Sequence, residues 1–138
     1  LRTIVAHLAE DQDYRDLFTT RDTFVTPLLA DAYGDSSGPG WQPYQFDADG
    51  PRSGILSHLS FMSLLAHPGR SSPTLRGQFV REVLLCDEVP TPPADIDFSI
   101  IEDVQGELRT ARERLDAHVS NESCAGCHNL TDPIGLAF

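Results

Sequence analysis

The sequence predicts a small, mostly α-helical domain with long loops rich in glycine and proline. Apolar residues recur at helical spacing in five segments, and no segment alternates strongly enough to predict a strand. Turn-forming residues gather over 34–54, and prolines gather over 89–93. A chain of 138 residues is long enough for one ordinary domain. We therefore expect a single unit over 1–138.

Two helices are predicted in the N-terminal part. Apolar spacing suits a helix from the start of the chain to about Ala9. A second helical pattern covers 23–33, and Gly34 follows it where a C-terminal cap is expected. The segment 34–54 then reads as a long loop.

Three further helices are predicted towards the C-terminus. One covers 54–66, so that His67 stands at its exit before Pro68, which disfavours helical geometry in the residue before it. Ser72 and Pro73 have the types preferred at the start of the next helix, which we expect to reach about Cys86 with that thiol buried among apolar side chains. An intermolecular disulfide is the alternative for Cys86. The last helix starts at a capping box formed by Thr110 and Glu113.

The charge of the chain excludes several classes of partner. All ten basic residues are arginine, and the formal net charge is −11. This field repels nucleic acid and anionic lipid, so that an electrostatic partner is expected to be basic. No apolar run reaches the length needed to cross a bilayer, so we expect no membrane span in this segment.

The pentapeptide Cys124-Ala125-Gly126-Cys127-His128 is the strongest chemical signal. Two thiols at this spacing, followed at once by an imidazole, are the signature of covalent c-type haem attachment. The motif predicts one covalent haem c, with thioethers at Cys124 and Cys127 and with His128 as the proximal iron ligand. Three alternatives remain: a thioredoxin-like pair, a zinc site and a simple disulfide.

The residues after the motif suggest how His128 is oriented. Iron-ligating imidazoles usually donate from their second ring nitrogen to an oxygen. The stretch Asp132-Pro133-Ile134-Gly135 has the composition of a turn. We expect a backbone carbonyl in this turn to accept that bond, which makes Pro133 a cofactor-site residue.

Several ordered phrases resemble one protein family. They are RSGILSH (52–58), HPGRSSPTLRG (67–77), LLC (84–86), ARERLDAH (111–118) and CAGCHNLTDPIGLA (124–137), while LFTTRDTFV (17–25) is similar to the end of a preceding module. Together they resemble the planctomycete-type, also myxobacterial, multidomain cytochrome c family, whose C-terminal haem-bearing modules are otherwise of unknown function.

The resemblance implies a c-type cytochrome-like domain, with a haem c module over 52–138 and the end of a preceding module over 1–34. It also implies an exported protein, periplasmic or extracellular, whose partner is a redox protein or a neighbouring haem domain. Family chains continue beyond Ala137, so we expect this chain to be a piece of a longer one.

A second axial ligand is needed for a low-spin haem, and spacing alone leaves three candidates. His67 is our first choice as a metal ligand because Pro68 restricts its backbone, and His58 and Met62 are the alternatives. His118 is expected near the haem edge rather than over the iron. Arg70 and Arg76 are expected to pair with the haem propionates.

Three functions are compatible with these residues. The first is single-electron transfer through one covalently bound haem. The second is a haem enzyme, peroxidase- or oxygenase-like, with an open distal side where a histidine acts as acid or base. The third is a structural haem-bearing subunit of a larger complex or filament.

Overall fold

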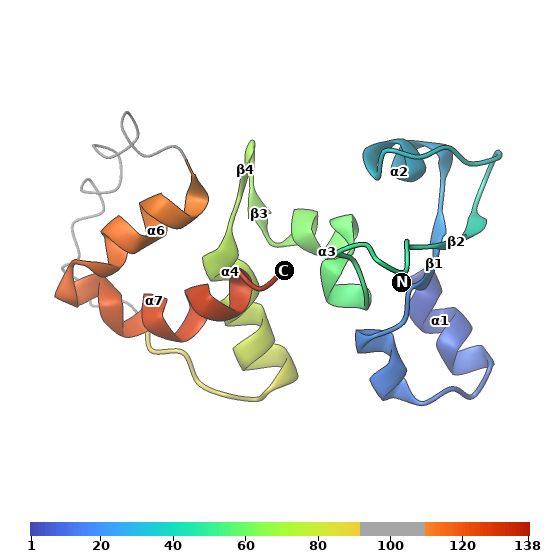
Figure 1. Cartoon of the computed structure of the whole chain (residues 1–138). Coiled ribbons are helices and arrows are strands. Elements are labelled where there is room, and N and C mark those ends of the chain that lie inside the picture. The colour runs from blue at the N-terminus through green and yellow to red at the C-terminus, as the bar shows by residue number, and fades with distance from the viewer. Residues whose placement is uncertain (92–109) are drawn as a thin grey trace. The chain divides into compact units, whose positions relative to one another are not determined.

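The computed structural model describes residues 1–91 and 110–138 and is mostly α-helical, as predicted (Figure 1). Contacts group the chain into two compact units, Leu1–Phe61 and Met62–Phe138. Each unit has its own packing centre: a strand pair in the first and a helix crossing in the second. The single haem-binding unit expected over 1–138 stays a prediction.

The N-terminal unit is built around a two-stranded antiparallel sheet. Strands β1 (Asp22–Val25) and β2 (Gln42–Gln45) pair so that Thr23 faces Tyr44. Helix α1 (Arg2–Ala9) contacts β1, and the Thr3 and Thr23 hydroxyl oxygens lie 2.8 Å apart in a buried hydrogen bond. A 3₁₀ turn, η1 (Tyr14–Phe18), follows α1, and the buried apolar residues of this unit are Leu17, Val25, Ala30 and Phe46.

The helix predicted over 23–33 is wrong in its first half. The chain forms β1 up to Val25, and helix α2 (Pro27–Ala32) starts only after Thr26, whose side chain accepts from the Leu29 amide. Proline is favoured in the first turn of a helix because its missing N–H has no helical partner there. Strand β2, the partner of β1, lies in the segment read as loop, and for this reason no strand was predicted. Gly34 does cap α2, with a φ of 81°.

The helix predicted over 54–66 is divided. A 3₁₀ turn, η2 (Ile55–Ser57), is separated from α3 (Leu59–Leu64) by His58, which is extended with ψ at 139°. Strands β3 (Ala66–His67) and β4 (Arg70–Ser71) then form a hairpin closed by Pro68 and Gly69, where Gly69 has a φ of 76°. Proline followed by a left-handed glycine is the signature of a type II turn.

The next helix starts as predicted. Helix α4 (Pro73–Phe79) is capped by Ser72, which accepts from the Leu75 amide, and it continues as a π-helical segment, η3 (Val80–Leu84). Cys86 follows with a φ of 57° and an exposed side chain, so the prediction of a buried thiol is wrong. The reason is that the helix has already ended at this point. Val89–Thr91 has no regular structure, and the rest of the predicted strap, 92–93, lies outside the described residues.

Two helices complete the C-terminal unit. Helix α6 (Ala111–Val119) starts at the predicted capping box between Thr110 and Glu113. Helix α7 (Glu122–Gly135) follows and crosses α4, its main packing partner (Figure 1). At this crossing a Cβ added to Gly77 would overlap the Thr131 carbonyl, and one added to Gly135 would overlap the Pro73 carbonyl. The two backbones therefore touch because both positions are glycine.

The glycine contact gives a stability prediction. Gly77→Ala should lower the free energy of unfolding by about 3 kcal/mol, because the backbone of α7 cannot move away as a flexible side chain could. Gly126→Ala in α7 is the matched control, since no atom of the described residues lies within 4 Å of its added Cβ. That variant should be neutral or stabilised by up to about 1 kcal/mol. Urea unfolding followed by circular dichroism measures both, and equal stability of the two variants would contradict the close crossing.

Candidate functional site

Helix α7 carries the two thiols and the imidazole of the motif on one face. Asn121 caps the helix by accepting from the Ser123 amide, and Cys124, Cys127 and His128 follow at positions i, i+3 and i+4. Side chains at these spacings are neighbours on a helix surface. Both cysteines are free thiols with partly exposed side chains, and the Cys127 thiol lies 3.0 Å from the Pro90 carbonyl oxygen as a donor.

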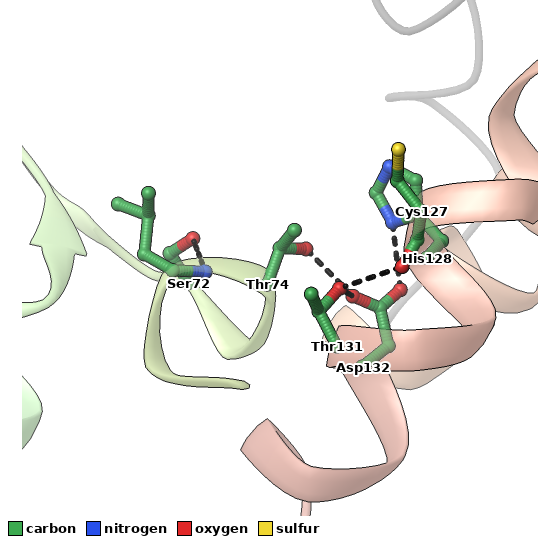
Figure 2. A network of polar contacts seen from close by, with 7 residues as sticks. Ser72, Thr74, Cys127, His128, Thr131 and Asp132 are labelled. Carbon is green, nitrogen blue, oxygen red and sulfur yellow. Dashed lines mark hydrogen bonds and ion pairs between the residues drawn. The ribbon is translucent and has the colours of Figure 1, made fainter. Parts of the chain in front are cut away.

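The His128 ring is held by a carboxylate one helical turn further on. Its Nδ1 lies 2.8 Å from Asp132 Oδ2 (Figure 2). With Nδ1 donating to this oxygen, the nitrogen left to bind a metal is Nε2. The prediction that a backbone carbonyl near Pro133 accepts this bond is therefore wrong. Residues 132–135 continue helix α7 instead of forming a turn, and exposed Pro133 sits inside the helix.

Two hydroxyl groups fix the same carboxylate from its other side. Asp132 Oδ1 accepts from Thr74 at 2.8 Å and from Thr131 at 3.2 Å (Figure 2). Thr74 belongs to α4, so this bond joins the two crossing helices. Asp132 is only 4% exposed. Sequence reasoning missed Asp132 as an orienting side chain, although its spacing of four residues from His128 on a continuous helix is the signal that would have found it.

The His118 side chain lies against His128. Their ring centroids are 4.6 Å apart with an interplanar angle of 32°. Burial lowers the pKa of His118, and the neighbouring His128 lowers it further. The His118 ring, which α6 supplies, therefore lies next to the His128 ring of the motif on α7.

Arg76 ties three elements of the C-terminal unit together. Its Nη2 and Nε donate to the Gly135 carbonyl at 2.8 and 3.2 Å, and its Nη1 donates to Ser71 Oγ at 2.8 Å. The side chain is 3% exposed, and burial lowers its pKa. The expected pairing of Arg76 with a haem propionate does not fit these contacts, because its guanidinium already donates to the carbonyl of Gly135 at the end of α7. Arg70 lies exposed on β4.

The structure places the three candidates for the sixth ligand in different settings. His67 is exposed on the β3–β4 hairpin, not at a helix exit as predicted, because α3 ends three residues earlier at Leu64. Met62 is half-buried on α3. His67 and Met62 both belong to the unit that carries α7.

His58 belongs to the N-terminal unit and packs there. Its ring centroid lies 5.6 Å from that of Phe46, and its buried Nε2 has no hydrogen-bond partner in the part of the chain that the structure describes. Burial lowers the pKa of His58. An unpaired buried nitrogen of this kind is stable only in the neutral ring.

Two features of the described residues bear on the alternatives raised by the sequence. Within 1–91 and 110–138, no cluster of three or more histidine, cysteine, aspartate or glutamate side chains has the arrangement needed for a bare metal ion. A structural zinc site requires four such ligands. In the same part of the chain, no helix has the length and apolar character to cross a membrane.

Comparison with known proteins identifies one family. The sequence model of PSCyt3, described as a protein of unknown function (DUF1588), matches residues 52–138. No curated protein and no solved structure matches the chain.

The contacts of Arg76 predict a large effect on stability. Arg76→Ala should lower the free energy of unfolding by about 3 kcal/mol, because it removes charge-assisted bonds and leaves the Gly135 carbonyl buried without a partner. Arg70→Ala, the matched control on the exposed strand β4, should change it by less than about 0.5 kcal/mol. Thermal unfolding of the two variants checks this, and a tolerated Arg76→Ala would refute the role of Arg76 as a structural tie.

Proposed function

This chain belongs to the PSCyt3 family, and we propose that it is a c-type cytochrome module that transfers single electrons through one covalently bound haem. The observation that carries the proposal is the arrangement on α7. Two free thiols and an imidazole share one face, and the Nδ1 of that imidazole is already engaged by Asp132. The name of the family, which contains the abbreviation of cytochrome, agrees with this proposal.

The donor set fits haem c. Cys124 and Cys127 would hold the group through thioether bonds, each thiol adding across one vinyl group with the sulfur on the carbon next to the ring and the hydrogen on the terminal carbon, and His128 would offer Nε2 to the iron. When bound, the haem supplies a one-electron couple between ferric and ferrous iron. The chain holds the ring of His128 in place and sets the environment of the iron.

His67 is our proposal for the sixth ligand. It stands beside a type II turn, whose restricted backbone lowers the entropic cost of holding a ligand in place. The hairpin is also anchored to the haem-bearing helix, because Arg76 binds Ser71 of β4 and Gly135 of α7. These contacts support His67 over His58, whose ring is packed in the other unit.

The proposal includes the cell compartment and the partner. Thioether formation by the dedicated maturation machinery takes place outside the bacterial cytoplasm, so we assign the protein to the periplasm or the cell exterior. The electron partner is a redox protein or a neighbouring haem domain, and the net charge of −11 favours a basic docking surface on it.

Covalent attachment is tested by extraction. Haem should stay on the exported protein through acid-acetone treatment. Cys124→Ser or Cys127→Ser should give a haem-poor product whose reduced pyridine adduct absorbs at longer wavelength, because one vinyl group stays conjugated. Cys86→Ser is the matched control and should keep full haem content, since this thiol is exposed beyond the end of η3. Complete extraction of haem from the unaltered protein would refute the proposal.

The sixth ligand is tested by optical spectra. His67→Ala should convert a low-spin spectrum to a high-spin one and open the iron to carbon monoxide, while His58→Ala and Met62→Leu should leave it low-spin. A far-red charge-transfer band that disappears in Met62→Leu would make Met62 the ligand instead. Ready binding of carbon monoxide to the unaltered protein would favour the haem enzyme with an open distal side over electron transfer.

A further inference from the structure

A buried network of hydrogen bonds holds the ring of the proposed iron ligand, His128. Asp132 is 4% exposed, and each of its carboxylate oxygens has a defined partner. Oδ2 meets His128 Nδ1 at 2.8 Å, and Oδ1 accepts from Thr74 at 2.8 Å and from Thr131 at 3.2 Å. The Asp132 carboxylate therefore places its negative charge next to one ring, that of His128.

Among residues 1–91 and 110–138, the Asp132 carboxylate forms no ion pair with an arginine, and the ring that it contacts is that of His128. Arg76 and Arg81, two arginines whose side chains contact α7, donate instead to the backbone carbonyls of Gly135 and Leu130. The negative charge is therefore directed at the imidazole.

We infer that Asp132 is a positioning residue that fixes the tautomer of His128 and strengthens it as an iron donor, which holds the reduction potential of the haem low. This inference rests on the proposed haem function. A carboxylate draws the Nδ1 proton more strongly than a neutral carbonyl does, and the ring becomes more electron-rich at Nε2. Greater electron donation stabilises ferric iron over ferrous iron, because the ferric state carries the larger positive charge.

The hydroxyl groups of Thr74 and Thr131 give the carboxylate its orientation. The single hydroxyl hydrogen of Thr131 is shared between Asp132 Oδ1 and the Cys127 carbonyl oxygen, which lies 3.3 Å from the hydroxyl oxygen, so the same side chain contacts the motif backbone (Figure 2). Because Thr74 lies on α4, the ring of His128 is oriented by two helices rather than by α7 alone. Rotation of the His128 ring about its Cβ–Cγ bond is thus restrained by Asp132 and Thr74, which lie outside the motif.

The test compares Asp132→Asn with Asp116→Asn in the haem-loaded protein. Both variants lose one negative charge, but Asp116 lies exposed on α6. Asp132→Asn should shift the one-electron equilibrium towards ferrous iron by at least tenfold, which is an upward shift of 59 mV in midpoint potential. It should also change the g-values of the ferric haem in electron paramagnetic resonance. Asp116→Asn should leave the g-values unchanged and shift the potential by much less.

A second measurement uses the unaltered protein, in case Asp132→Asn does not fold. In the reduced protein labelled with ¹⁵N-histidine, the Nδ1 proton of His128 should give a sharp resonance that exchanges slowly with solvent. A rapidly exchanging proton would overturn the inference, as would equal potentials and g-values in the two variants. Neither result bears on haem attachment, which the acid-acetone extraction tests separately.

Discussion

The direct contact between the backbones of α4 and α7 is the constraint on which the C-terminal unit depends. Gly77 meets the Thr131 carbonyl, and Gly135 meets the Pro73 carbonyl, so neither helix can carry a side chain at its contact point. Helices that pack through larger side chains keep their axes about 8–10 Å apart. The absence of Cβ atoms here brings polar groups of one helix within hydrogen-bonding reach of the other.

The polar contacts follow from that proximity. Thr74 at the start of α4 reaches Asp132 near the end of α7, and Arg76, two residues further along, reaches Gly135. Each contact satisfies a buried polar atom that would otherwise be costly, since an unpaired buried group costs about 1–3 kcal/mol. The helices are thus joined by directional hydrogen bonds as well as by the contact of their backbones.

Local signals in the sequence were sufficient where a structure is defined by neighbouring residues. Ser72 with Pro73, Thr110 with Glu113, and Gly34 each specify a helix end within a few positions, and all three predictions are confirmed. Strand β1 could not be found in this way, because its partner β2 lies about twenty residues away in a segment of loop composition. Pairing of this kind is decided by tertiary contacts that override local propensity.

The residues of the candidate site also divide into those that a local pattern predicts and those that only tertiary contacts bring together. Cys124, Cys127 and His128 form a contiguous motif and were found by spacing alone. Thr74 is separated from Asp132 by 58 positions and became visible only through the helix crossing. His67 was placed at a helix exit because Pro68 ends a helix, yet the chain turns back as a hairpin there. Proline indicates where a helix must stop, but it does not indicate how much earlier the helix has ended.

The contact between Cys127 and Pro90 bears on the proposed haem attachment. The Cys127 thiol donates to the Pro90 carbonyl oxygen. A thioether sulfur carries no hydrogen, so under the proposed attachment this bond would exist only in the chain that has not yet reacted. The Pro90 carbonyl would then distinguish the unreacted from the reacted chain, because it would exchange its thiol partner for water or for another donor.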